Sequence, residues 1–127
     1  MVKFVFCLRR LPHLSREEFL DYWLNQHGPL AVSLQKVLGM TKYIQLHTLA
    51  TPFDDALRSS RGGPEPYDGM VEAWWESLEA VQHALEDPAA QTAWAVLIED
   101  EQRFIDVKNS PLWFAEEHPM IPGPSPT

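Results

Sequence analysis

The chain has 127 residues, 45% of them hydrophobic and 22% charged, and it carries a formal net charge of -8. This length predicts one domain with a single hydrophobic core, and the acidic balance argues against nucleic acid or an anionic membrane as a partner, since both need a basic surface. The single cysteine, Cys7, cannot form an internal disulfide, no stretch approaches the roughly 18 apolar residues of a membrane span, and the first residues do not resemble a signal peptide. We therefore expect a cytoplasmic protein.

The chain opens with a predicted strand and a predicted helical segment. Residues 3–9 form a short apolar run that is rich in aromatic and β-branched side chains, as strands are. Ser15 stands three residues before Glu18, a capping box that opens a helix. The helical spacing runs through Gly28-Pro29, where the proline predicts a kink or break at His27-Gly28.

The middle of the chain predicts two more strands joined by a long loop. Gly39 ends the helical segment, and the alternating residues 42–47 predict the second strand. Residues 51–66 are polar and rich in glycine and proline, which predicts a loop. Such a loop is long for a compact domain, so it is either a functional lid or a mobile segment. Residues 67–75 predict the third strand.

The last part of the chain predicts two helices, a fourth strand and a tail. Apolar spacing marks a short helix over 78–85, and Asp87-Pro88 begins another as N-cap and first turn. The acids at 99–101 are interpreted as a solvated helix end, and residues 103–107 as the fourth strand. Residues 1–117 then form the domain and 118–127 a Pro-rich tail whose last residues we expect to be disordered.

The resulting order, β-α-β-β-α-β, is the ferredoxin-like arrangement of the α+β class, with an antiparallel four-stranded sheet. Helices can cover only one face of such a sheet. The first strand is apolar on both faces, with Phe4 and Phe6 alternating with Val5 and Cys7. We therefore predict a homodimer in which two sheets pack face to face.

His27 is the first candidate for chemistry. It follows Trp23 by four residues on one helical stripe and lies at the proline break, where an imidazole facing the sheet could act as general base or acid. The alternative is a histidine that only fills space. Asp68, if buried, could have a raised pKa and donate a proton.

The strand residues around these candidates could line a binding site. Glu72 and Trp74 share the parity of Asp68 on the third strand, and Tyr43 and His47 share one face of the second. Charged strand residues usually face water and strand aromatics usually serve packing, so both alternatives stay open. No metal-ligand motif, GxGxxG, Walker spacing or GxSxG elbow occurs, so we expect neither metal nor cofactor.

The sequence resembles the EthD family. The resemblance covers roughly residues 2–117 and is carried by short motifs, namely Leu8-Arg9-Arg10, Pro12, Leu14-Ser15-Arg16-Glu17-Glu18-Phe19, Tyr22-Trp23, His27-Gly28-Pro29-Leu30 and Glu99-Asp100-Glu101 to Phe104-Ile105-Asp106. Several ferredoxin-like families share the Phe-x-x-Tyr-Trp and His-x-Pro patterns, which occur here at Phe19 to Trp23 and at His27 to Pro29. The long 51–66 segment departs from the family's usual short connection.

The resemblance implies a dimeric α/β barrel made of two ferredoxin-like units. The family is named for a component of an ether-degradation system, and its descriptions lean toward oxidoreductases. Related barrels include cofactor-free monooxygenases, cyclases and dehydratases, whose pocket lies between sheet and helices and is often bordered by the histidine of the His-x-Pro pattern, here His27.

Two functional hypotheses follow. The first is a cofactor-free enzyme on a small apolar, aromatic or polyketide-like substrate, in which His27 moves a proton, Asp68 orients it, and Trp23, Tyr43 and Trp74 exclude water. The second is a non-catalytic small-molecule binding or accessory protein that uses the same pocket. A purely structural dimer is a third possibility.

Overall fold

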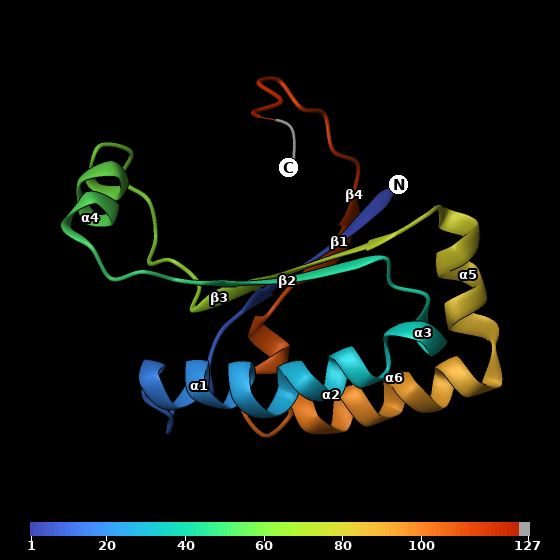
Figure 1. The fold of residues 1–127 in the computed structure, drawn as a ribbon. Coiled ribbons are helices and arrows are strands. Elements are labelled where there is room, and N and C mark those ends of the chain that lie inside the picture. The colour runs from blue at the N-terminus through green and yellow to red at the C-terminus, as the bar shows by residue number, and fades with distance from the viewer. Residues whose placement is uncertain (125–127) are drawn as a thin grey trace.

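The computed structural model describes residues 1–124, in which helices cover one face of a four-stranded antiparallel sheet (Figure 1). The strands are β1 (Val2–Leu8), β2 (Lys42–His47), β3 (Gly69–Trp75) and β4 (Leu112–Ala115). The helical elements are α1 (Arg16–Tyr22), the π-helical turn η1 (Trp23–His27), α2 (Gly28–Ser33), α3 (Gln35–Leu38), α4 (Pro52–Ser59), α5 (Leu78–Glu86), α6 (Pro88–Glu101) and the 3-10 turn η2 (Val107–Asn109).

The sheet has the order β2-β3-β1-β4, so the predicted ferredoxin-like arrangement is confirmed. The predicted position of the fourth strand is wrong. Residues 103–106 form a turn in which Ile105 makes an isolated bridge to Arg10, beyond the end of β1. Val107 begins η2, and β4 follows at Leu112–Ala115, paired with β1. Phe104 and Ile105 are apolar because both lie in the core, at 0% and 2% exposure.

The helical segment after β1 continues through Gly28 without the predicted break. Ser15 and Glu18 form the expected capping box, and Gly39 ends the segment in the left-handed conformation with φ 78°. Between them, the chain widens into the π-helical turn η1, where the Gly28 N–H donates to the carbonyl of Trp23. Pro29 falls in the first turn of α2, where its missing N–H is not needed.

The predicted 51–66 loop contains the helix α4. Its N-cap, Thr51, accepts a hydrogen bond from the Asp54 N–H at 3.3 Å, and Asp54 Oδ2 accepts one from the Thr51 N–H at 3.2 Å. This capping box was hidden by the glycines and prolines around it. The helix lies away from the other helices, on the opposite side of the sheet (Figure 1). Phe53 and Leu57 on it are 77% and 61% exposed.

The two faces of the sheet have different surroundings. The inner face packs on the helices in two clusters, one centred on Trp75 with α6 and one on Phe6, Trp23 and Phe104. Within residues 1–124 no helix covers the outer face, which carries Leu46 and Trp113 at 40% and 47% exposure. This is the apolar second face expected from the alternation in the strands.

The C-terminal tail extends from β4 along the outer side of the sheet, where Glu117 accepts a hydrogen bond from the Trp74 indole. Disorder was expected for the last residues of the tail, and of these, residues 125–127 lie outside the part of the chain that the structure describes. No helix of residues 1–124 is long and apolar enough to cross a membrane.

Candidate functional site

A small cavity lies between the inner face of the sheet and the helices. Its volume is about 50 Å³, and its walls come from β1, β2, β3, the η1–α2 segment and α6. The lining is mostly aliphatic and aromatic, and its polar side chains include His27, Tyr43 and Glu101. The cavity thus places three titratable groups in apolar surroundings, where hydrogen bonds and charge interactions are stronger than in water.

The His27 imidazole is fixed by a buried carboxylate. Its Nδ1 lies 2.7 Å from Asp100 Oδ2, and both side chains are about a tenth exposed or less. Because the carboxylate only accepts hydrogen bonds, Nδ1 carries the proton, and Nε2 is the unprotonated nitrogen of the neutral ring. Burial lowers the pKa of His27, although the hydrogen bond and charge of Asp100 raise it in part, so the ring is neutral at pH 7.

Asp100 holds this arrangement through three side-chain donors. Tyr22 donates its hydroxyl to Oδ1 at 2.6 Å, and Arg103 donates to the same oxygen at 3.0 Å. Burial alone would raise the pKa of Asp100, but the bonds from Tyr22, His27 and Arg103 hold it below the usual value. Asp100 is therefore an ionised residue that positions His27, in the manner of the carboxylate in a catalytic triad.

Glu101 is the second titratable group of the cavity. Burial, with a smaller contribution from the charge of Asp100, raises the pKa of Glu101 from 4.5 to about 7. A carboxyl that titrates near neutrality can donate or accept a proton at physiological pH. The last turn of α6 thus supplies both an orienting carboxylate and an acid–base group.

The interpretation of residues 99–101 as a solvated helix end is wrong for two of its three members. Glu99 is exposed, but Asp100 is 7% exposed and Glu101 is partly buried against the cavity. The signal was present in the spacing, because positions 100 and 101 follow Leu97 by three and four residues and so continue the inner stripe of the helix.

Two of the other predicted site residues, Trp23 and Tyr43, do line the cavity. Trp23 is fully buried, and its ring stacks on His47 at 4.7 Å and 15°. Among the described residues its indole N–H has no hydrogen-bond partner. Burial raises the pKa of Tyr43, and the neighbouring Gln45 and Trp23 side chains offset part of this effect. His47 lies on the other side of Trp23 and does not line the cavity.

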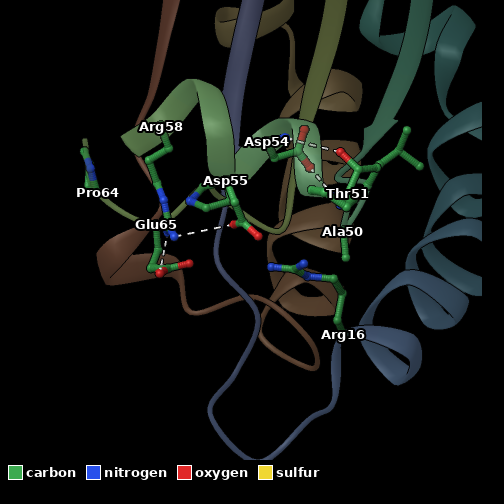
Figure 2. Close-up of a pocket in the computed structure, with 11 residues that line it drawn as sticks. Arg16, Ala50, Thr51, Asp54, Asp55, Arg58, Pro64 and Glu65 are labelled. Carbon is green, nitrogen blue, oxygen red and sulfur yellow. Dashed lines mark hydrogen bonds and ion pairs between the residues drawn. The ribbon is translucent and has the colours of Figure 1, made fainter. Parts of the chain in front are cut away.

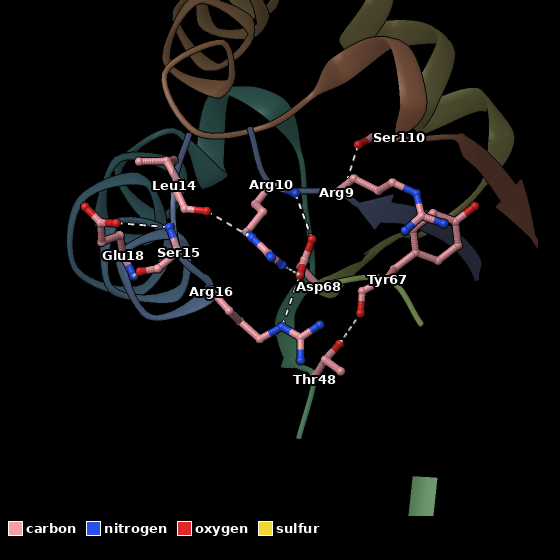
Figure 3. A network of polar contacts seen from close by, with 10 residues as sticks. All are labelled: Arg9, Arg10, Leu14, Ser15, Arg16, Glu18, Thr48, Tyr67, Asp68 and Ser110. Atoms are coloured by element: carbon pink, nitrogen blue, oxygen red, sulfur yellow. Dashed lines mark hydrogen bonds and ion pairs between the residues drawn. The ribbon is translucent and has the colours of Figure 1, made fainter. Parts of the chain in front are cut away.

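Asp68 belongs to a different cluster, shown in Figure 3. Its carboxylate accepts hydrogen bonds from the Arg10 backbone N–H at 2.9 Å, from the Arg10 guanidinium and from Arg16 Nε at 3.0 Å. Burial favours a higher pKa, but these bonds hold the pKa of Asp68 below its usual value, in contrast to the raised pKa we expected. Asp68 does not line the cavity, and the carboxylate that orients His27 is Asp100.

Glu72 and Trp74 lie on the outer face of the sheet, away from the cavity lining. Glu72 pairs with Lys3, and the ammonium groups of Lys3 and Lys42 lie 4.9 and 4.7 Å from the centre of the Trp74 ring. The expected grouping of Glu72 and Trp74 on one strand face is present, but that face is the one opposite to the helices.

A larger open hollow of about 430 Å³ separates α4 from the body of the protein (Figure 2). Its charged side chains are largely paired with one another, since Arg58 binds Asp55 at 3.5 Å and also contacts Glu65. Of the residues predicted from sequence to form a site, none lines it. In the described part of the chain, no group of three or more His, Cys, Asp or Glu side chains could hold a metal ion.

Comparison with known proteins places these features in a family context. Residues 11–108 match the family described as EthD domain. A solved EthD family protein from Bacillus halodurans C-125 is 19% identical, with a TM-score of 0.60 and coverage of 93% of this chain and 100% of that chain. No curated protein matches the chain.

Other solved structures share the same fold at lower identity. HapK from Hahella chejuensis is 12% identical, with a TM-score of 0.61 over 100% of both chains. A dimeric ferredoxin-like protein of unknown function from Bacteroides fragilis NCTC 9343 is 13% identical, with a TM-score of 0.58 over 91% of this chain and 95% of that chain. At these identities the likeness concerns the fold alone.

Proposed function

This chain belongs to the EthD family, and we propose that it is an enzyme that transfers a proton on a small, largely apolar or aromatic, polyketide-like substrate. The observation that carries the proposal is the lining of the cavity. A neutral imidazole with its proton held on Nδ1 and a carboxyl with a pKa of about 7 line the same apolar space.

These groups support proton abstraction next to a carbonyl. His27 Nε2 takes the proton from the carbon, the electron pair of the C–H bond moves into the carbonyl, and protonated Glu101 gives its proton to the carbonyl oxygen. The product is an enol. Both groups are reset when His27 gives its proton to a carbon atom or to water and Glu101 takes a proton back from the enol hydroxyl or from water. The step is complete without a cofactor or an oxidant, and it suits cyclase or dehydratase reactions of an activated carbon.

The remaining residues have supporting roles in this proposal. Asp100 replaces Asp68 as the group that fixes the tautomer and orientation of His27. Trp23 and Tyr43 form walls that exclude water and strengthen the polar interactions. Glu72 and Trp74 are assigned to the outer face of the sheet rather than to the substrate.

The proposal includes a homodimer formed through the outer faces of two sheets. The exposed apolar side chains on this face support it, as does the fact that two solved structures of the same fold are described as dimeric. A cytoplasmic location is part of the same proposal and is supported by the single unpaired Cys7.

An assay that does not require the natural substrate tests the proposed proton abstraction. A panel of small ketones and 1,3-dicarbonyl compounds is incubated with the protein in D2O, and proton NMR measures the exchange of hydrogens next to the carbonyl. At least one compound should exchange faster with the wild-type protein, and His27→Gln and Glu101→Gln should slow that exchange by roughly a hundredfold or more.

Glu99→Gln is the matched control, because its side chain is one residue from Asp100 but 76% exposed. It should leave the exchange rate unchanged. Equal rates for wild-type protein and His27→Gln would contradict the enzymatic proposal. Binding of a compound without any exchange would favour the alternative, a non-catalytic small-molecule binding or accessory protein.

A further inference from the structure

A second hollow lies next to the cavity, between the edge strand β2 and the η1–α2 segment. It is an open groove of about 520 Å³. Leu24, Pro29 and Val32 form its helical wall, and the side chains of Tyr43 and His47 form the wall on β2. No lining side chain is charged at pH 7, since burial lowers the pKa of His47, so the groove suits a neutral, flat and largely apolar molecule.

The Tyr43 side chain lies between this groove and the cavity. It lines both hollows and is half-buried, with one part in the core and another part open to solvent. The cavity alone, at about 50 Å³, has room for a few water molecules but is smaller than the roughly 150 Å³ that holds benzene. The groove lies within the range of roughly 300–1,000 Å³ that is usual for ligand sites.

One side chain, Gln45, holds Tyr43 in the separating position. Its Nε2 donates to the Tyr43 hydroxyl and to the Trp23 carbonyl, both at 3.0 Å. Because a carbonyl only accepts, Nε2 must face Trp23, and Oε1 therefore accepts a hydrogen bond from His47 Nε2 at 2.8 Å. Gly28 leaves the space for this amide, since a Cβ there would lie 2.8 Å from Gln45 Nε2.

An unpartnered polar atom lies at the same boundary. Among the described residues, the buried Trp23 indole N–H makes no hydrogen bond, while its ring lines the cavity and stacks on His47 of the groove. An unpaired buried donor is unfavourable, because the N–H has lost its water and gained no other partner. An oxygen acceptor on a ligand could satisfy it.

We propose that the groove and the cavity are two compartments of one ligand site, which join when Tyr43 turns away from Gln45. The groove binds the flat apolar part of a small aromatic molecule. The oxygen-bearing end of this molecule passes Tyr43 and reaches the Trp23 N–H and His27. That the end reaching His27 is the reacting end rests on the proposed function, whereas the joining of the compartments does not.

The test uses 2-naphthol, a flat aromatic molecule with one oxygen, and NMR signals of the two histidine rings. Titration of the wild-type protein should shift the signals of both His47, at the groove, and His27, at the cavity. Leu24→Glu, which puts a charge into the groove wall, should weaken binding by roughly tenfold. Leu85→Glu on α5 is the matched control, because both leucines are 55% exposed, and it should bind as the wild type does.

A second variant tests the hydrogen bond between Gln45 and Tyr43. Tyr43→Phe keeps the ring but removes the hydroxyl that accepts from Gln45, so association of 2-naphthol should become faster by roughly threefold or more in stopped-flow fluorescence. Absence of binding, a shift of His47 without a shift of His27, or an association rate equal to that of the wild type would overturn the proposal.

The outcome is separable from that of the proposed function. His27→Gln should slow hydrogen exchange by roughly a hundredfold or more but still bind 2-naphthol. Binding that reaches both histidines in a protein without any exchange activity would leave the joined site standing and remove the enzymatic assignment.

Discussion

At the scale of single residues, two neighbouring acids on α6 behave in opposite ways. Asp100 receives three side-chain hydrogen bonds and has a lowered pKa, whereas Glu101 faces the cavity and has a pKa raised to about 7. Environments that push the pKa values of two nearby groups apart are typical of acid–base sites. The different roles proposed for the two residues follow from their environments.

The link between Asp100 and His27 can be measured directly. Asp100→Asn removes the negative charge that partly offsets the effect of burial, so the pKa of His27 should fall further below its usual value. Hydrogen exchange on the substrate should slow by roughly a hundredfold or more, because the imidazole loses its fixed tautomer. Titration of the His27 ring by NMR is the measurement, and an unchanged or higher pKa would speak against the positioning role.

Glu101 should also appear in the stability of the protein. Its pKa is higher in the folded state, about 7 against 4.5, so the folded protein retains a proton that the unfolded chain loses in this window. The free energy of unfolding therefore keeps the full contribution of the neutral carboxyl below pH 4.5. It loses this contribution as the pH rises through 7, by a total of about 3 kcal/mol.

Glu101→Gln removes this loss. The variant should be more stable than the wild type by about 3 kcal/mol at a pH above 7 and similar to it at a pH below 4.5, in urea unfolding. Glu99→Gln is the control and should follow the wild type. If the difference in unfolding free energy between Glu101→Gln and the wild type were the same at every pH, Glu101 would not be held in its neutral form.

At the scale of elements, the Asp68 cluster fastens the turn after β1 to the start of β3. Asp68→Asn weakens its bonds to Arg10 and Arg16, and we expect a loss of roughly 2–3 kcal/mol in the free energy of unfolding. Binding of 2-naphthol should not change, because Asp68 lines neither the cavity nor the groove. A large loss of affinity with normal stability would return Asp68 to the functional site.

The elements that could be predicted from the sequence are those with a local signal. The capping box at Ser15, the helix end at Gly39 and the alternation of 42–47 depend on neighbouring residues, and each is where it was expected. The predicted position of the fourth strand is wrong because Phe104 and Ile105 are apolar core residues in a turn. A short apolar run looks the same in the sequence whether it forms a strand or a buried turn.

The site was less predictable, because it depends on contacts between distant segments. His27 and Asp100 are 73 positions apart and meet only when α6 packs on η1. Parity placed Glu72 and Trp74 together on β3 but could not tell which face the helices cover. The π-helical turn that sets the position of His27 has no local signal beyond Gly28-Pro29.

At the scale of the whole molecule, the outer face of the sheet should join two copies of the chain. Leu46 lies on this face of the edge strand β2 and is 40% exposed. Leu46→Glu should shift the protein from dimer to monomer at micromolar concentration in light scattering, since two buried charges would oppose each other. Leu85→Glu should remain dimeric, and a wild-type protein that is monomeric at this concentration would contradict the arrangement.

NMR titration of Glu101 and His27 in the wild-type protein shows whether the cavity beneath the sheet is an acid–base site. We expect the Glu101 carboxyl carbon to titrate near pH 7, and the His27 ring at this pH to be neutral with its proton on Nδ1. A Glu101 carboxyl that titrates near its ordinary value of 4.5, or a His27 ring that is charged at pH 7, would contradict it.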